Sequence, residues 1–340
     1  MIVIENIRID DNVYPVLLRL LHNRTGLNFE YYRRNHIEKR LMARMIRVKC
    51  KTLQSYYDYL FSNEEEFRKF LDSFNINYTF FFRDWEVYDT FQNIFIEGLN
   101  CKREKIVSNI RPKPSQLVRF HTKENFLKNQ KKKERFGNNL EKNSDLTKYF
   151  PQFSFYRNLK FPKSTKIPIK IWSCPCASGE EPYTIAMILD NLSKQIQNFP
   201  KYEIVASDID NDSILKAITG IYNEDSMKEI TDFYKNKYFK RIQRPYGYDY
   251  LVNEEVKNLV EFINEDVTKG HKKKSNKYDI IFFRYILIYV NRENRNKFIN
   301  IIENRLNRGG LLILGKTETL LHSWSNLKLI DSNNQIYLKF

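Results

Sequence analysis

The sequence predicts an α/β fold with a mostly parallel sheet, preceded by a small all-α part. Between residues 12 and 74, apolar residues recur at three- and four-residue steps, which is typical of amphipathic helices. From Ile167 onward, strand-like apolar runs alternate with helical runs, and this alternation favours a parallel sheet with helices on both faces. A chain of 340 residues is long enough for both parts.

The first part contains three helical patterns. The stretch "YPVLLRLLHNRTG" ends at Gly26, a suitable C-terminal stop, and "NEEEF" is typical of a capped helix start. Between them, "NHIEKRLMARMIRVKCK" places apolar side chains on one face and cations on another. The apolar face is formed by Ile37, Leu41, Met45 and Val48, and the basic stripe by Arg40, Arg44, Arg47 and Lys51. Without further information, the basic stripe is a solvated helix face.

The middle of the chain carries most of the positive charge. Between Cys101 and Lys170 there are 19 Lys and Arg residues against 5 Asp and Glu, whereas the whole chain has a net charge of +16. A basic protein suggests nucleic acid as a partner, but here the charge belongs mainly to one Lys- and Asn-rich insertion. Nucleic-acid binding therefore remains an alternative, although nucleic acid is not the expected partner.

In the second part of the chain, strand-like runs alternate with helical runs. The strand-like runs are 167–174, 202–210, the beginning of 278–290, and 310–318, and the helical runs are 180–196, 211–222 and 292–306. Residues 327–340 predict a terminal hairpin, and 245–266 show strand propensity without a helix. The predicted domains are a helical domain at 1–85, a linker with the basic insertion at 86–165, and an α/β domain at 166–340 with a β subdomain near 240–265.

The loop "CPCASGEEPY" lies between a strand and a helix, where a nucleotide-binding loop would be expected. It has one glycine, Gly179, followed by Glu180 and Glu181, so it matches neither G-x-G-x-x-G nor a P-loop, and its acids would repel phosphate. S-adenosylmethionine has no phosphate and carries a sulfonium and an ammonium group. Asp208 ends the next strand and is placed to accept from ribose hydroxyls. The alternative is that both glutamates only complement the helix dipole.

Several motifs resemble one enzyme family. The stretches "IWSCPCASGEEPYTIAMIL", "ASDIDNDSILKAITGIY", "YDIIFFRYILIYV" and "GGLLILGKTE" are similar to those of the CheR family of chemotaxis receptor glutamate O-methyltransferases. The stretch "INYTFFFRDWEVYDTF" matches that family's N-x-T-x-F-F-R signature. Its matching residues are Asn77, Thr79, Phe81, Phe82 and Arg83. The resemblance covers nearly the whole chain except about 101–165.

The resemblance implies both a fold and an activity. The fold is a Rossmann-like class I S-adenosylmethionine-dependent methyltransferase sheet with an inserted small β subdomain, preceded by a small all-α N-terminal domain. The activity is methyl transfer from S-adenosylmethionine to glutamate side chains of methyl-accepting chemotaxis receptors, with S-adenosylhomocysteine as the product. A glutamate acceptor is already ionised near neutral pH, so no strong general base is expected.

The resemblance also implies site residues. Arg83 and Tyr289 are the expected catalytic residues, since Arg83 can steer the acceptor carboxylate and Tyr289 can donate a hydrogen bond near it. Glu181 is expected to hold the methionine amino group, with Glu180 as a close alternative. The other expected cofactor contacts are Asn77, Thr79, Arg83, Asp208, Asp266, Val267, Phe283 and Arg284. Phe80, Phe81 and Phe82 are expected to pack between the domains.

The expected partners are the cytoplasmic domains of chemotaxis receptors, contacted through Arg40, Arg44 and Arg47. Family members that dock a receptor's C-terminal pentapeptide have a glycine-rich turn in the β subdomain. Here "KRIQRPYGYDYLV" has only Gly247, so no pentapeptide tether is predicted.

At the position after Arg284 the family commonly has Asn, and here it is Tyr285. This departure keeps a non-catalytic module that binds S-adenosylmethionine or receptors as one alternative. A nucleic-acid methyltransferase, suggested by the basic charge, is the other. The pair Cys174 and Cys176 is too small for a metal site, so no metal is expected. The four cysteines fit a reducing compartment, and the chain has no apparent signal peptide, so we expect a cytoplasmic protein.

Overall fold

The computed structural model describes residues 9–74, 79–99, 167–269, 277–320 and 326–340. Asn77 and the basic insertion at 101–165 lie outside these residues. The chain forms two compact units. The helical unit comprises 1–78, 266–270 and 285–301, and the α/β unit comprises 79–265, 271–284 and 302–340.

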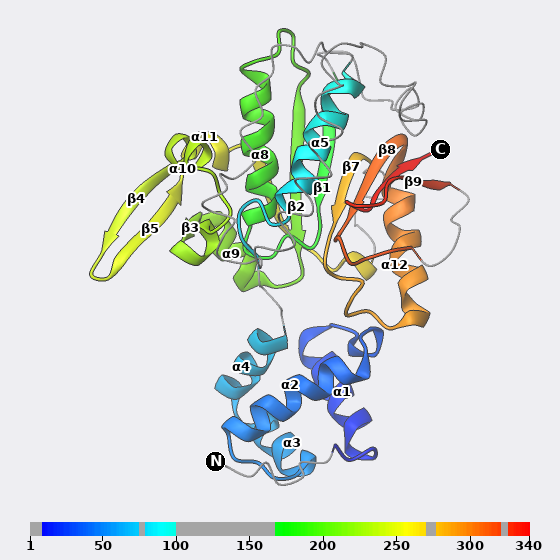
Figure 1. The fold of residues 1–340 in the computed structure, drawn as a ribbon. Coiled ribbons are helices and arrows are strands. Elements are labelled where there is room, and N and C mark those ends of the chain that lie inside the picture. The colour runs from blue at the N-terminus through cyan, green and yellow to red at the C-terminus, as the bar shows by residue number, and fades with distance from the viewer. Residues whose placement is uncertain (1–8, 75–78, 100–166, 270–276, 321–325) are drawn as a thin grey trace, which may run out of the picture. The chain divides into compact units, whose positions relative to one another are not determined.

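The helical unit confirms the predicted all-α part (Figure 1). Its elements from the first part of the chain are α1 (Val13–Thr25), η1 (Phe29–Tyr31), α2 (Arg34–Arg47), α3 (Leu53–Ser62) and α4 (Glu64–Phe74). Gly26 ends α1 in the left-handed conformation at φ 72°. The predicted apolar face of α2 is buried at Ile37, Leu41 and Met45. Asn63 accepts a hydrogen bond from the backbone N–H of Glu66, which confirms the capped start of α4.

Arg44 does not belong to a solvated stripe, so the expectation that it contacts a receptor is wrong. Its guanidinium is buried and forms two hydrogen bonds to Glu66, one of 2.9 Å from Nε to Oε1 and one of 2.5 Å from Nη2 to Oε2. The hydroxyl of Tyr56 donates to the same carboxylate over 2.9 Å. Arg44 thus joins α2 to α3 and α4, because a buried charge is stable only when it is paired. Arg47 and Lys51 are exposed and Arg40 is half-buried.

The α/β unit is built on a seven-stranded sheet with the strand order β6-β2-β1-β7-β8-β10-β9. The strands are β1 (Ile169–Ser173), β2 (Tyr202–Asp208), β6 (Val260–Asn264), β7 (Tyr278–Phe283), β8 (Leu306–Leu314), β9 (Leu327–Asp331) and β10 (Ile336–Lys339). The first five strands in this order pair in parallel, whereas β10 is antiparallel to both β8 and β9. This confirms the predicted Rossmann-like sheet and the terminal hairpin.

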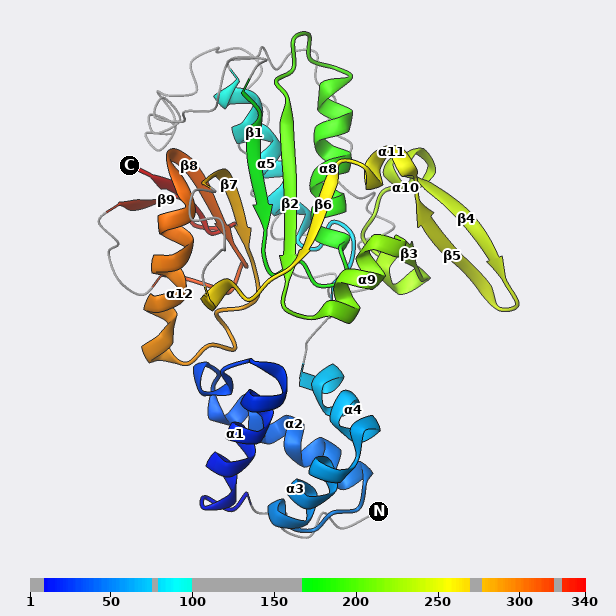
Figure 2. The ribbon, with the colours of Figure 1, turned by 180° about the vertical axis from the view of Figure 1, so that it is seen from behind.

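Two helices, α5 (Trp85–Gly98) and α8 (Glu180–Ser193), lie on one face of this sheet, and Figure 2 shows the strands from the opposite side (Figures 1 and 2). Residues 86–98 were predicted to belong to a linker, and that prediction is wrong. Val87, Phe91 and Phe95 of α5 are fully buried in the core of the α/β unit. Burial of these side chains fixes α5 as part of the fold. The remaining helices within the described residues are α9 (Asn211–Thr219), η5 (Glu224–Met227), α10 (Asp232–Tyr238), α11 (Glu254–Lys257), η6 (Val267–Lys269) and α12 (Arg292–Arg305).

A small antiparallel sheet, with the order β3-β5-β4, forms the predicted β subdomain. Its strands are β3 (Ile221–Tyr222), β4 (Phe239–Arg244) and β5 (Gly247–Val252). The predicted range of 240–265 is too long, because β6 pairs in parallel with β2 and so belongs to the large sheet.

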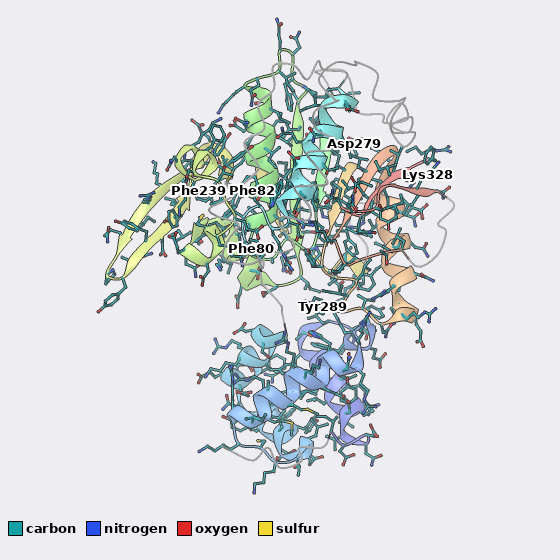
Figure 3. All side chains as sticks on the ribbon, in the orientation of Figure 1. Phe80, Phe82, Phe239, Asp279, Tyr289 and Lys328 are labelled. Atoms are coloured by element: carbon teal, nitrogen blue, oxygen red, sulfur yellow. The ribbon has the colours of Figure 1, made fainter. Side chains whose placement is uncertain are left out.

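The aromatic run at 80–82 packs inside the α/β unit, and the expectation that it packs between domains is wrong. Phe81 meets Tyr222 and Phe239 edge-on, at ring-centroid distances of 4.8 and 4.9 Å. Phe82 lies 4.6 Å from the ring of Tyr234. Figure 3 shows Phe80, Phe82 and Phe239 close together in this region. The run therefore anchors the signature segment of Arg83 to the small sheet and α10.

The described residues contain neither a membrane-spanning helix nor a cluster of potential metal ligands. No helix among them is long and apolar enough to span a membrane. Within the same part of the chain, no group of three or more His, Cys, Asp or Glu side chains has a geometry that could hold a metal ion.

Candidate active site

The loop between β1 and α8 is fixed by its own backbone groups. The N–H of Cys174 donates to the carbonyl of Phe282 over 2.9 Å, and the N–H of Cys176 donates to that of Ser207 over 3.0 Å. The N–H of Ala177 donates to the carboxylate of Asp208 over 2.8 Å. The loop therefore lies across the carboxyl ends of β2 and β7, the neighbours of β1, where parallel sheets place their ligands.

Gly179 is required by the fold. Its φ is 93°, and an added Cβ would lie 2.7 Å from Cβ of Ala217 and 3.0 Å from the hydroxyl of Tyr222. Any other residue would be strained in this conformation and would collide with α9. No local sequence pattern predicts this contact between the loop and α9.

The two adjacent glutamates have different surroundings. Glu180 is buried, and its carboxylate accepts from Ser178 over 2.8 Å and from Ser226 over 3.1 Å. The side chain of Glu181 is 12% exposed and accepts from Ser173 over 2.8 Å and from Arg284 over 3.1 Å. Burial raises the pKa of both carboxyl groups, and the charge of Arg284 opposes this rise at Glu181. Glu180 thus links the loop before α8 to η5, through Ser178 and Ser226, while the side chain of Glu181 keeps an accessible edge.

Arg284 is the centre of a buried polar cluster. Its Nη1 donates to the hydroxyl of Tyr88 over 2.9 Å and to Glu181, and its Nη2 donates to the carbonyl of Arg83 over 3.0 Å and to the carboxylate of Asp84. Only 2% of the Arg284 side chain is exposed. The guanidinium therefore fixes the orientation of Glu181 and of the Arg83–Asp84 turn at the same time.

Asp208 ends β2 and binds two backbone N–H groups. One carboxylate oxygen accepts from Ala177, and the other accepts from Asp210 over 3.0 Å. Burial raises the pKa of Asp208 to about 6, from an ordinary value of 3.8, although these hydrogen bonds act in the opposite direction. Each oxygen still has a lone pair available for a hydroxyl donor.

Comparisons with known proteins agree with this arrangement. Residues 148–336 match the family described as "CheR methyltransferase, SAM binding domain", and residues 14–74 match "CheR methyltransferase, all-alpha domain". The chain belongs to the CheR methyltransferase family. It is 26% identical over 308 residues to Chemotaxis protein methyltransferase 2 of Vibrio cholerae, which covers 88% of this chain and 82% of that protein. It is also 26% identical over 318 residues to a Chemotaxis protein methyltransferase of Borreliella burgdorferi, covering 93% and 90% of the two chains.

The residues of this CheR chain fit S-adenosylmethionine. Glu181 offers a carboxylate to an ammonium or sulfonium group, and Asp208 offers acceptors to a ribose. No phosphate has to be accommodated, which agrees with a loop that carries acids and a single glycine. The polar groups near the ends of β1 and β2 are thus consistent with the S-adenosylmethionine-binding domain of the family and with a class I fold.

The titration of Asp208 predicts a pH dependence of cofactor affinity. Ionised Asp208 is the expected acceptor for the ribose hydroxyls, so we expect the affinity for S-adenosylhomocysteine to fall as the pH decreases through about 6. In Asp208→Asn the affinity should be low at every pH and the slope should be smaller. Isothermal titration calorimetry between pH 5 and 8 measures both. An unchanged slope in Asp208→Asn would assign the titration to another group.

The same shift has the opposite effect on the stability of the protein without cofactor. The folded state binds the Asp208 proton more tightly than the unfolded state does. Protonated Asp208 therefore stabilises the folded state at low pH, and this stabilisation is lost as the pH rises through about 6.

The other expected residues of the α/β unit have mixed outcomes. Arg83 is half-buried. Burial raises the pKa of Glu181, and the positive charge of Arg83 opposes that rise. Thr79 is half-buried, and Asn77 lies outside the described residues. Phe283 is fully buried at the end of β7, so its side chain belongs to the core and does not line an accessible pocket floor.

Three expected site residues belong to the helical unit. Asp266 accepts from the backbone N–H and the hydroxyl of Thr268, over 2.9 and 2.6 Å, at the start of η6. Val267 is the first residue of η6 and is half-buried. Tyr289 lies on the segment before α12, where the ring of His36 is 4.7 Å from its own ring (Figure 3).

Tyr285 adopts a φ of 62°. Asn is tolerated in this left-handed region far better than a bulky residue is. The backbone conformation by itself therefore accounts for the Asn that the family commonly has here, and it does not explain why this chain has Tyr.

Sequence reasoning missed Asp84 and Tyr88, which bind Arg284. The sequence carries a weak signal for this pair. Asp84 directly follows Arg83 at the start of a helix, and Tyr88 lies four residues further on, on the same helix face. It also missed Ser173, which donates to Glu181 from the end of β1.

Proposed function

We propose that this protein transfers a methyl group from S-adenosylmethionine to glutamate side chains of methyl-accepting chemotaxis receptors. The observation that carries the proposal is the pair of carboxylates formed by Glu181, in the first turn of α8 with a side chain 12% exposed, and the buried Asp208 at the end of β2, in a chain of the CheR family. The relatives named above are chemotaxis protein methyltransferases. The forming ester is a neutral product, so the reaction suits a site that removes the acceptor from water.

The proposed chemistry needs alignment more than acid–base catalysis. Bound S-adenosylmethionine supplies a methyl group on a positively charged sulfur. The acceptor carboxylate forms the C–O bond while the C–S electron pair returns to the sulfur, which gives an ester and S-adenosylhomocysteine without any proton transfer. Glu181 holds the ammonium group, Asp208 the ribose hydroxyls, and Asp266 and Val267 the adenine. Arg83 steers the acceptor carboxylate and Tyr289 donates a hydrogen bond to it.

The deciding experiment identifies the product. The protein is incubated with methyl-labelled S-adenosylmethionine and either a receptor cytoplasmic domain or RNA, and the product is then treated with base. We expect a label on the receptor that base releases as methanol, because a glutamyl methyl ester is hydrolysed by base. A base-stable label on RNA would indicate a nucleic-acid methyltransferase. Cofactor binding without any transfer would indicate a non-catalytic module.

We also propose that α2 contacts the receptor, through fewer residues than the sequence predicts. Because Arg44 is buried against Glu66, the contact is assigned to Arg40 and Arg47 alone. Reversing both charges to Glu should raise the receptor KM about tenfold and leave the Kd of S-adenosylhomocysteine unchanged. The matched control is the double change Lys201→Glu and Lys328→Glu, which alters the net charge equally at exposed positions elsewhere. Equal effects of the two double variants would contradict a contact through α2.

A further inference from the structure

Tyr289 is attached to the N-terminal helices through its backbone. The N–H of Arg33 donates to the carbonyl of Tyr289 over 2.8 Å, and the N–H of Asn291 donates to the carbonyl of Tyr31 over 2.8 Å. Between these two bonds, Tyr32 and Val290 form an antiparallel bridge. Residues 31–33 and 289–291 thus form a short two-stranded ribbon inside the helical unit.

Side chains reinforce this ribbon at its far end. The amide of Asn291 donates to the carbonyl of Glu30 over 2.7 Å. The ring of Tyr31 meets that of Phe298 edge-on at 5.9 Å, and Lys297 bonds to the Tyr31 hydroxyl. The backbone position of Tyr289 is therefore fixed by residues that precede α2 and by residues of α12.

The ring of Tyr289 is in contact with His36. The two ring centroids are 4.7 Å apart at an interplanar angle of 38°. His36 lies in the first turn of α2, and its backbone N–H donates to the carbonyl of Arg33 over 2.9 Å. His36, whose ring contacts Tyr289, is therefore hydrogen-bonded to Arg33, which binds the backbone of Tyr289. Ring contacts of this kind restrict aromatic orientation as well as burying area.

We propose that His36 is a positioning residue for Tyr289. The ribbon fixes the backbone of Tyr289, and the imidazole of His36 fixes the direction in which its ring and hydroxyl point. This inference rests on the proposed function, in which the Tyr289 hydroxyl donates to the acceptor glutamate. A residue of the N-terminal helices would then set the geometry of methyl transfer through Tyr289. Small displacements of an aligned group lower the rate far more than they lower binding.

The first test compares His36→Ala with His36→Phe. His36→Ala should lower kcat about tenfold, with unchanged receptor KM and unchanged Kd for S-adenosylhomocysteine. His36→Phe keeps a flat ring beside Tyr289 and should restore most of kcat. Thermal denaturation of both variants monitors folding. Equal losses of kcat in the two variants, or losses that follow their melting temperatures, would overturn the proposal.

A double-mutant cycle tests whether His36 acts through Tyr289. In a Tyr289→Phe background the hydroxyl is absent, so His36→Ala should cause little further loss of kcat. Additive losses from the two changes would show that His36 acts by another route, and this result would also overturn the proposal.

A measurement without turnover separates this inference from the proposed function. The ring resonances of Tyr289 are assigned in a ¹³C-tyrosine-labelled sample by their loss in Tyr289→Phe. We expect them to shift in His36→Ala and to remain near their wild-type positions in His36→Phe. If the wild-type enzyme methylates no receptor, the proposed function fails, and the resonances alone decide the contact. Unchanged resonances in His36→Ala would overturn it.

Discussion

Replacement of Glu181 by Gln should weaken the binding of S-adenosylhomocysteine by about 10- to 100-fold, since a hydrogen bond to a charged group contributes about 1.5–3 kcal/mol. The change removes the negative charge and keeps the size of the side chain and its contact with Ser173. Glu181 is the adjacent glutamate with an accessible edge, and Arg284 fixes its direction. Calorimetric titration at pH 7.5 measures the effect directly.

The matched control is Glu180→Gln, an identical change at the neighbouring residue. Glu180 is buried between Ser178 and Ser226, so its replacement should lower the melting temperature and leave cofactor affinity close to the wild-type value. If Glu180→Gln weakened binding more than Glu181→Gln did, the ammonium contact would have to be reassigned to Glu180.

Replacement of Arg284 by Met should lower the free energy of unfolding by about 3–5 kcal/mol, because it leaves carboxylates in a buried cluster without their cation. The carboxylates concerned are those of Asp84 and Glu181, with side chains that are 22% and 12% exposed. Cofactor binding should be lost as well, since Glu181 would no longer be held in place. Urea denaturation followed by circular dichroism gives the stability change, and calorimetry gives the affinity.

Two further variants make the Arg284 result specific. Lys316 pairs with Glu86 at 2.8 Å, but both side chains are partly exposed, so Lys316→Met should cost at most about 1 kcal/mol. Arg284→Lys keeps the charge but lacks the planar fork that reaches several acceptors, so it should be intermediate. A stability loss in Arg284→Met no larger than that in Lys316→Met would contradict the role of the cluster.

The main elements of the fold were predictable from local patterns. The strands β1 and β2 are apolar runs that end in polar residues, β7 is an apolar run followed directly by Arg284, and the strand order in the sheet determines which ends meet. Glu181 and Asp208 could be proposed for the same reason, since each follows a strand of this kind. The departure from a phosphate-binding loop was visible in the residue types themselves.

The remaining features depend on residues that are distant in sequence. Arg44 has the same helical spacing as Arg40 and Arg47, and only the position of Glu66 on another helix shows that it is buried. Arg284 meets Asp84 across 200 positions of the chain, so no local pattern reveals their pairing. These contacts arise from tertiary packing, which periodicity does not report.

The need for glycine at position 179 has a similar origin. The atom that an added Cβ would meet belongs to Ala217, on a different helix. The sequence suggested only that a turn there would benefit from a residue without a side chain.

The ribbon that joins residues 31–33 to residues 289–291 affects how the helical unit could be exchanged between proteins. The unit is assembled from three separate stretches, 1–78, 266–270 and 285–301. A fragment that ends at residue 78 would lack Val290 and Asn291, and would leave the backbone groups of Tyr31 and Arg33 without these bonds. Grafting of the N-terminal helices from one relative onto another therefore requires all three stretches to be transferred together.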